Sequence, residues 1–259
     1  MKLTFLGTGT SYGVPQIGCR CAVCRSTDPR DRRTRSGAVV TTAGGARLLI
    51  DTPPELRLQL TANDIDRVDA VLYTHEHADH THGIDDLRAV SMRRGSPLPI
   101  YGPPTTLSSL ALRFPYIFDE QMPPTPGTTR PEGRTHALAA GVTVRIADAD
   151  VTPVEVPHGG MTVFGYRIGG LAYITDAKCL PAAALAIVKG ASVLVLNALL
   201  RTGHPTHLSI DEAVETARRV GAERTFLTHL THENSHADLE AELPPGVQPA
   251  FDGLTVRVD

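Results

Sequence analysis

The stretch Leu72-Tyr73-Thr74-His75-Glu76-His77-Ala78-Asp79-His80 follows an apolar segment with the composition of a β-strand. It has the pattern H-x-H-x-D-H, so four side chains able to bind a metal ion leave one loop. His75 and His77 can face the same way and bind one ion, while Asp79 and His80 turn toward a second. Imidazole and carboxylate suit zinc, manganese or iron, and suit calcium poorly. A single histidine at a strand end is usually only a hydrogen-bonded polar residue, but four ligand-type side chains in six positions indicate a metal centre.

Three later segments supply further ligands, and each stands where a predicted strand ends. These are His158, Asp176 and His229. Strand carboxyl ends are where α/β scaffolds build their sites, so the side chains are expected to meet there. A carboxylate such as Asp176 is the natural bridge between two cations.

A second cluster of ligand-type residues lies near the amino terminus. Cys19, Cys21 and Cys24 form C-x-C-x-x-C, which is either three ligands of a tetrahedral zinc or a redox-active trio. The fourth ligand for a zinc is expected to be His232, three residues after His229. Cys179 stands alone and is expected to be an ordinary buried thiol.

Length and composition favour one domain over residues 1–259. Hydrophobic residues make up 41% of the chain and charged residues 20%, which excludes a disordered protein. No apolar run approaches the ~18 residues of a membrane span, and no secretory signal is evident, so a cytoplasmic location without membrane association is expected. A net charge of −3 disfavours nucleic acid as the main partner.

Apolar runs alternate with helical segments, which predicts sheets packed between helices. Gly44-Gly45 and Gly169-Gly170 predict hairpins, and Ser209 with Glu212 predicts a capping box. The proline-rich segment Arg113–Arg134 is expected to form an extended arm. The predicted strands are Leu3–Leu6, Ala38–Thr42, Arg47–Asp51, Ala70–Thr74, Val142–Ile146, Val151–Val156, Val163–Ile168, Ala172–Thr175, Val193–Leu196 and Thr225–Thr228. The predicted helices are Pro54–Ala62, Asp85–Arg93, Thr105–Phe114, Pro181–Val188, Ile210–Val220 and Ala237–Leu243.

Taken in order, these residues resemble the ligand set of the metallo-β-lactamase fold superfamily. The resemblance implies an αββα sandwich, here with a small zinc-stapled loop region near the amino terminus. It implies that one ion is held by His75, His77 and His158, the other by Asp79, His80 and His229, with Asp176 bridging them. It also implies that Asp51 supports the metal loop from behind.

The opening Leu6–Ser11, the cysteines and Thr228–His232 resemble the cyclic phosphodiesterase branch of that superfamily, typified by phosphoribosyl 1,2-cyclic phosphate phosphodiesterase. The resemblance implies two divalent ions, manganese or zinc with iron as a third option, and one structural zinc. It assigns His207 and Asp79 as catalytic residues. The implied reaction is in-line attack by a metal-bridging hydroxide on a small phosphorylated substrate, and the implied assembly is a homodimer.

Three other functions remain open. They are a nuclease of the tRNA 3′-processing type, a carbonyl-ester or thioester hydrolase, and a metal-binding protein without turnover. The arginines between Arg20 and Arg35 could hold a substrate phosphate or an RNA backbone, or simply form a solvated surface paired with acidic helices.

Overall fold

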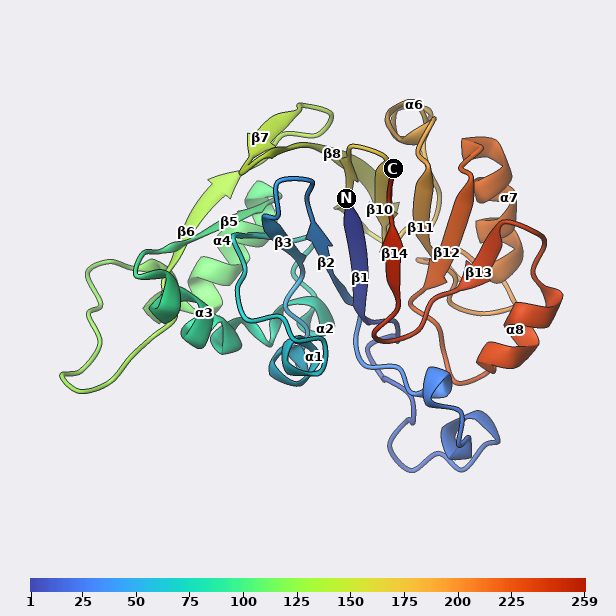
Figure 1. Cartoon of the computed structure of the whole chain (residues 1–259), viewed down its shortest axis with the longest axis horizontal. Helices are drawn as coiled ribbons and strands as arrows, with labels where there is room; N and C mark the ends of the chain where they lie inside the picture. The colour runs from blue at the N-terminus through green and yellow to red at the C-terminus, as the bar shows by residue number, and fades with distance from the viewer.

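Two seven-stranded β-sheets face each other, and helices cover the outer face of each (Figure 1). The computed structural model describes residues 1–259. The strand order is β14-β1-β2-β3-β4-β5-β6 in the first sheet and β13-β12-β11-β10-β9-β8-β7 in the second. The predicted αββα sandwich is therefore confirmed.

Each sheet contains a parallel run and an antiparallel run. Strands β3 to β6 of the first sheet and β10 to β13 of the second pair in parallel, and the other neighbours pair antiparallel. The first sheet comprises β1 (Lys2–Gly7), β2 (Gly37–Thr41), β3 (Arg47–Ile50), β4 (Ala70–Leu72), β5 (Leu98–Gly102), β6 (Gly133–Ala137) and β14 (Thr255–Arg257). The second comprises β7 (Val144–Ile146), β8 (Ala149–His158), β9 (Met161–Ile168), β10 (Leu171–Ile174), β11 (Val193–Asn197), β12 (Arg224–Thr228) and β13 (Val247–Pro249).

The helices are short, and none is long and apolar enough to cross a membrane. They are α1 (Leu56–Ala62), α2 (Ala78–Thr81), α3 (Leu87–Arg94), α4 (Pro104–Arg113), α5 (Pro115–Phe118), α6 (Ala182–Val188), α7 (Ile210–Val220) and α8 (His236–Glu242). Three 3₁₀ turns accompany them, at Val23–Arg25, Pro29–Asp31 and Ile84–Asp86.

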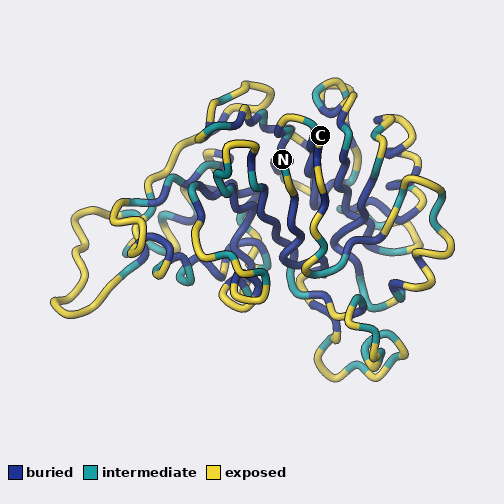
Figure 2. The backbone as a smooth tube through the Cα atoms, viewed as in Figure 1, coloured by how far each residue is buried: buried dark blue, intermediate teal, exposed yellow.

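Alternation along the central strands produces three apolar layers. Leu48 and Ile50 of β3 point into the core between the sheets, whereas Leu49 between them packs under the helices of the first sheet. This is the period of two expected for a strand, and burial on both faces explains why such strands read as continuous apolar runs. Figure 2 shows the buried backbone concentrated in the strands.

Helix α7 is the predicted element that the structure reproduces to the residue. The Ser209 side chain accepts from the backbone N–H of Glu212, and the Glu212 carboxylate accepts from that of Ser209, which confirms the capping box. Gly221 ends the helix with φ of 71°, a left-handed conformation that glycine adopts without penalty. The hairpin at Gly169-Gly170 is also confirmed, joining β9 and β10.

The proline-rich arm differs from its prediction at both ends. Residues 115–118 form helix α5, and Gly133 already begins β6, so only about 119–132 run as an extended excursion. Figure 2 shows this excursion as mostly exposed. Arg130 ties it down, because its guanidinium donates to the carbonyls of Tyr116 (2.8 Å) and Asp119 (2.9 Å).

The Gly7-Thr8-Gly9 turn after β1 packs closely against another segment. A Cβ on Gly7 would lie 2.0 Å from the carbonyl oxygen of Arg35, and one on Gly9 would lie 2.7 Å from that of Arg33. Gly9 also bridges to Leu230. The glycines therefore allow this turn to sit between two loops that border the candidate site.

Candidate metal centre and active site

Loops at the carboxyl ends of the strands carry the candidate ligands. His75 and His77 follow β4, His158 ends β8, Asp176 follows β10 and His229 follows β12. Each strand ends at its candidate ligand or a few residues before it, which leaves the side chain at the edge of the sheet.

The backbone at three of the site residues is left-handed. Asp51, Asp176 and His229 have φ of 62°, 47° and 58°, and they are three of only five non-glycine residues with positive φ. This conformation is unfavourable for residues with a Cβ and persists where the surrounding structure fixes it. The Asp176 and His229 side chains contact each other, and the Asp51 side chain contacts His80.

The first group of ligand atoms comprises His75, His77, His158 and Asp176, whose donor atoms all lie within 4.8 Å of one another. His75 Nε2 lies 2.9 Å from His77 Nδ1 and 3.8 Å from Asp176 Oδ2. His158 Nε2 is also 3.8 Å from Asp176 Oδ2, and its Nδ1 donates to the carbonyl of Thr206 at 3.1 Å. That bond leaves His158 Nε2 free to face the group.

The second group comprises His80, His229 and the same Asp176. Here the other carboxylate oxygen is used, since Asp176 Oδ1 lies 3.4 Å from His80 Nε2 and 3.5 Å from His229 Nδ1. Asp79 is adjacent, with Oδ2 3.6 Å from His80 Nε2, but it does not join this tight set. Each oxygen of Asp176 thus faces one group.

The charges in the cluster are set by burial and by three carboxylates. Burial lowers the pKa of His75 well below its usual value and that of His229 to about 4, so both imidazoles are neutral and offer a lone pair. Burial alone would raise the pKa of Asp176, but His229 and His80 outweigh it and hold that pKa well below its usual range. Burial likewise opposes the charge on His80, yet Asp176, Asp79 and Asp51 raise its pKa well above normal.

These residues fit a pair of divalent cations. His80 Nε2 is buried and has no hydrogen-bond partner, although it points at two carboxylates. Buried polar atoms are rarely left unpaired. A protonated His80 imidazole between the two carboxylates supplies the positive charge that a bound cation would supply there. The donor set of neutral imidazoles and carboxylates is the one that zinc and manganese accept.

Asp51, the residue predicted to support the metal loop, makes three hydrogen bonds to that loop. Its Oδ2 lies 2.7 Å from His80 Nδ1 and accepts from Thr74 Oγ1 at 2.8 Å, while its Oδ1 accepts from the Thr74 backbone N–H at 2.8 Å. Asp51 therefore fixes the orientation of His80 and leaves its Nε2 aimed at the cluster.

We expect Asp51→Asn to lower the metal affinity of the centre by about 10–100-fold. All three donors point at carboxylate oxygens, so either orientation of an amide places an NH₂ against a donor. The measurement is metal titration of the stripped protein, with Asp66→Asn on the surface as control. Unchanged affinity in a folded Asp51→Asn protein would contradict the supporting role.

His207 lies at the open side of the cluster, in the loop between β11 and α7. Its Nε2 is 3.2 Å from Asp176 Oδ2, and its ring stacks on that of His229 with centroids 4.9 Å apart. Thr206 Oγ1 lies 2.8 Å from its Nδ1.

The sequence did not reveal two further contacts of the candidate ligands. The Thr206 carbonyl accepts from His158, and Ser36 Oγ lies 3.1 Å from His229 Nδ1. Threonine and serine are not typical metal ligands, so a pattern of ligand-type residues includes neither.

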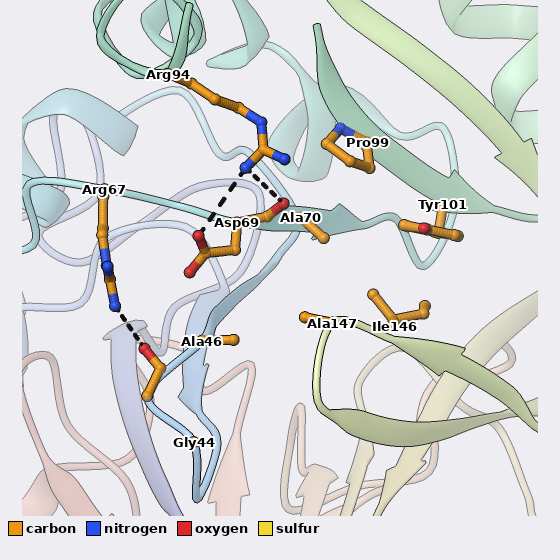
Figure 3. Close-up of a pocket in the computed structure, with 11 residues that line it drawn as sticks. Gly44, Ala46, Arg67, Asp69, Ala70, Arg94, Pro99, Tyr101, Ile146 and Ala147 are labelled. Carbon is orange, nitrogen blue, oxygen red and sulfur yellow. Dashed lines mark hydrogen bonds and ion pairs between the residues drawn. The ribbon is translucent and has the colours of Figure 1, made fainter. Parts of the chain in front are cut away.

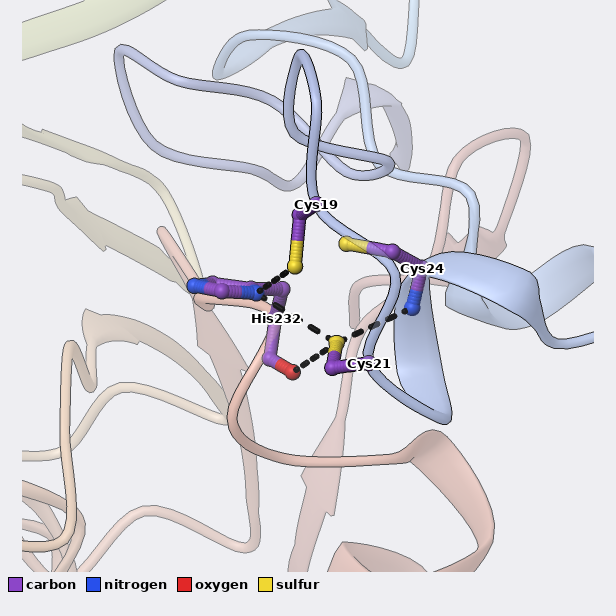
Figure 4. A group of neighbouring side chains, drawn as sticks. All are labelled: Cys19, Cys21, Cys24 and His232. Atoms are coloured by element: carbon purple, nitrogen blue, oxygen red, sulfur yellow. Dashed lines mark hydrogen bonds between the residues drawn. The ribbon is translucent and has the colours of Figure 1, made fainter.

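The cysteine cluster is brought together with the predicted histidine. Figure 4 shows the three cysteine sulfurs around the imidazole of His232. Cys19 Sγ and Cys21 Sγ lie 3.3 and 3.4 Å from His232 Nδ1, and the four donor atoms are within 4.8 Å of one another. A backbone N–H from Cys24 and then His232 lower the pKa of Cys21 to about 6. Three sulfurs and one imidazole match a tetrahedral zinc.

The structure also bears on the expectations for the fourth cysteine and for the arginines between Arg20 and Arg35. Cys179 is exposed, so the expectation of a buried thiol was wrong; it lies in the turn before α6 rather than in a strand or helix. Of the six arginines between Arg20 and Arg35, three form ion pairs, with Arg30 on Asp28 and Glu240, Arg33 on Asp31, and Arg35 on Glu55.

A pocket of about 400 Å³ opens beside the histidine cluster. Its lining includes His207 and His229, and it reaches His232 of the cysteine cluster. None of residues 119–132 of the arm lines it, so the arm does not shape this pocket.

A second groove lies at the opposite end of the sheets and has no ligand cluster. Figure 3 shows it bordered by Arg67, Arg94 and Tyr101, at the amino ends of β3 and β4. Its two arginines are already engaged, Arg67 with the Gly45 carbonyl and Arg94 with Asp69. The chemistry of the molecule is therefore placed at the other end, beside the histidines.

Comparison with known proteins agrees with this geometry. A family model described as "Beta-lactamase superfamily domain" matches residues 46–230, which span β3 to the loop after β12. The chain belongs to the beta-lactamase superfamily. Within it, a crystal structure of a diphosphatase from the PhnP family superposes with a TM-score of 0.91 at 38% identity, covering 100% of this chain and 98% of that one. The chain is therefore in the PhnP-like branch of the beta-lactamase superfamily.

Two curated relatives add to the comparison. An octanoyltransferase of Porphyromonas gingivalis is 39% identical over all of this chain, but the chain spans only 52% of that protein's length. A ribonuclease Z of Mycobacterium sp. (strain KMS) is 27% identical over 88% of this chain and 84% of its own length. Proteins named for different activities thus match the same chain, so its reaction has to be inferred from the site.

Proposed function

We propose that this protein is a metal-dependent phosphodiesterase acting on a small cyclic phosphate. The observation that carries the proposal is Asp176, whose Oδ2 faces one histidine group and whose Oδ1 faces the other. A carboxylate shared between two ligand sets suits a hydrolytic site with two closely spaced cations. The PhnP-family diphosphatase and the ribonuclease Z relative, both named for hydrolysis of phosphate bonds, support the same reaction class.

Two divalent cations, manganese or zinc, would be held by side chains already directed at them. His75, His77 and His158 would hold one, and His80 and His229 with Asp79 would hold the other, while Asp176 is shared. When bound, they supply Lewis acidity that activates water and neutralises charge on the phosphoryl oxygens. The cysteine cluster would hold a separate structural zinc.

His207 is the proposed proton donor to the departing oxygen. It combines contact with the cluster through Asp176 with a place in the lining of the open pocket, so its imidazole reaches the substrate side. An imidazole can donate a proton through its ring N–H, which suits general acid catalysis. Lys178, the nearby ammonium, is held by both carboxylate oxygens of Glu212 at 2.7 and 2.9 Å and is not free for this role. Asp79 is the other proposed catalytic residue, next to His80.

The decisive experiment is turnover after the protein has been stripped and reloaded with manganese or zinc. Substrates are bis(p-nitrophenyl) phosphate, 2′,3′-cyclic nucleotides and phosphoribosyl 1,2-cyclic phosphate, the substrate that the family resemblance implies. Metal-dependent cleavage of the cyclic diesters is expected. Silence on every diester with full metal content would overturn the proposal, and cleavage of an RNA 3′ trailer in preference to small diesters would make the protein a nuclease.

For His207→Ala we expect kcat to fall about 10²–10⁴-fold, the usual contribution of a general acid, with metal content unchanged. His204→Ala is the matched control, because His204 lines the same pocket and lies 3.3 Å from His207 without touching Asp176. Metal analysis and kcat are measured together. Loss of metal from His207→Ala would make His207 a ligand instead of an acid.

A further inference from the structure

The pocket beside the histidine cluster is bounded by three loops. Thr10–Gln16 follows β1, Leu199–His207 follows β11, and His229–Glu233 follows β12. Its volume of about 400 Å³ lies in the range of small-ligand sites. A substrate whose phosphate lies at the cluster must place its remaining atoms in the space beside His207 and His229.

The lining of this pocket is poor in positive charge. Apart from histidines, Glu233 is the single lining residue with a formal charge, and no lysine or arginine contributes. The Glu233 carboxylate is exposed and makes no ion pair or side-chain hydrogen bond. Phosphate groups are normally held by arginine or lysine, so a second phosphate placed here would meet a free carboxylate instead.

One wall of the pocket is an aromatic ring left open to solvent. Tyr12 is 69% exposed although it lines the pocket. Its backbone is fixed by the turn that Thr10 forms, since Thr10 Oγ1 accepts from the Tyr12 N–H at 3.3 Å and the Thr10 carbonyl accepts from the Gly13 N–H at 2.9 Å. An exposed ring on an ordered turn beside a catalytic cluster is suited to stacking on a planar group.

The polar groups near that ring are free to bind a ligand. The Ser11 hydroxyl and the Gln16 amide side chain have no hydrogen bond to the protein, as is true of the Glu233 carboxylate. Hydroxyl, amide and carboxylate groups together match the hydroxyls of a sugar and the edge of a heterocycle.

Resting on the phosphodiesterase function above, we propose that this pocket selects an uncharged, ring-bearing group attached to the scissile phosphate, with Tyr12 as the specificity-determining residue. Among small cyclic phosphates, a nucleoside 2′,3′-cyclic phosphate has such a group. Phosphoribosyl 1,2-cyclic phosphate has a second phosphate and lacks the base, so the pocket disfavours it.

The kinetic test compares two variants of the same loop. Tyr12→Ala is expected to raise KM for adenosine 2′,3′-cyclic phosphate about tenfold, the equivalent of one lost base–aromatic stack, with kcat within about threefold. Tyr12→Phe, which keeps the ring, is expected to retain the wild-type KM. Ile17→Ala is the matched control, because Ile17 is an exposed apolar residue of this loop (97% exposed) that does not line the pocket.

A charge variant tests the second half of the proposal. Glu233→Lys places a cation in the pocket and is expected to lower KM for phosphoribosyl 1,2-cyclic phosphate relative to adenosine 2′,3′-cyclic phosphate. The proposal is overturned if Tyr12→Ala leaves KM for the adenosine substrate unchanged, or if the wild-type protein prefers the doubly phosphorylated substrate.

Equilibrium binding keeps this proposal separate from the catalytic one. Calorimetry gives the ratio of the Kd values for adenosine 2′-monophosphate and inorganic phosphate on the metal-loaded protein, because both ligands carry the same metal-binding group. We expect adenosine 2′-monophosphate to bind more tightly, so that its Kd divided by the Kd of inorganic phosphate is below one, and we expect Tyr12→Ala but not Ile17→Ala to raise this ratio about tenfold. A protein that cleaves no diester but shows this change retains the pocket assignment and loses the catalytic one. An unchanged ratio rejects the pocket assignment.

Discussion

Cys21→Ser is expected to lower the metal content by one zinc per chain and to destabilise the fold by roughly 3 kcal/mol or more. Cys21 lies centrally in its cluster, with its sulfur near His232 Nδ1, the His232 carbonyl and the Cys24 N–H. Serine is a poor zinc ligand and cannot supply a thiolate. For a domain of this size the loss corresponds to a fall in Tm of roughly 6–12 °C.

Loss of the structural zinc is also expected to affect the histidine cluster, because one short loop joins the two clusters. His232 is three residues from His229. The loop that holds both is anchored by the buried guanidinium of Arg33, which donates to the carbonyl of Thr231 between them and to that of Asn234 beyond them. Release of His232 frees one end of this loop, so kcat for diesters is expected to fall as well.

Cys179→Ser is the matched control for Cys21→Ser. It makes the same chemical change at an exposed thiol outside the cluster, so zinc content and Tm are expected to stay at wild-type values. If Cys21→Ser also keeps its zinc and its Tm, the cysteines do not form a structural zinc site. Reversible loss of activity on thiol oxidation in that case would favour the redox alternative.

The parts of this protein that the sequence predicts well are those with short-range signals. H-x-H-x-D-H places its ligands within one loop, and α7 has a capping box and a terminal glycine, so each is visible in a few residues. The later candidate ligands, His158, Asp176 and His229, are visible in the sequence because each closes an apolar strand. The same strand-end argument locates them all at one edge of the sheets.

Other parts depend on partners far away in the chain. Strand β14 is three residues long and pairs with β1, which comes from the other end of the chain, and β6 is polar and exposed, so neither has an apolar pattern of its own. The contact of Ser36 with His229 and the ion pair of Arg30 with Glu240 also join residues far apart in the chain. Such features follow from tertiary packing, which propensity and periodicity do not contain.

For Asp176→Asn we expect kcat/KM to fall by roughly three orders of magnitude, the equivalent of about 4 kcal/mol of transition-state stabilisation. Five imidazoles approach this carboxylate within 3.8 Å, from His75, His80, His158, His207 and His229. An amide keeps the shape and loses the charge. Its NH₂ must also point at one of the two histidine groups, where it cannot act as a ligand.

Metal-linked stability distinguishes this effect from simple misfolding. A ligand present at a hundredfold excess over its Kd stabilises the native state by about 2.7 kcal/mol, so the wild-type Tm should rise when manganese or zinc is added to the stripped protein. In Asp176→Asn that rise is expected to shrink, while the zinc of the cysteine cluster is retained, because Cys19, Cys21, Cys24 and His232 do not contact Asp176.

Asp150→Asn is the matched control for Asp176→Asn, since Asp150 is an exposed aspartate on β8, the strand that ends at His158. Its turnover and its metal-induced rise in Tm should equal those of the wild type. If Asp176→Asn binds two cations at the histidine cluster with unchanged affinity, Asp176 does not bridge them, and the two histidine groups act as independent sites. The structural argument for hydrolysis by two bridged cations would then fail, because no other carboxylate faces both groups.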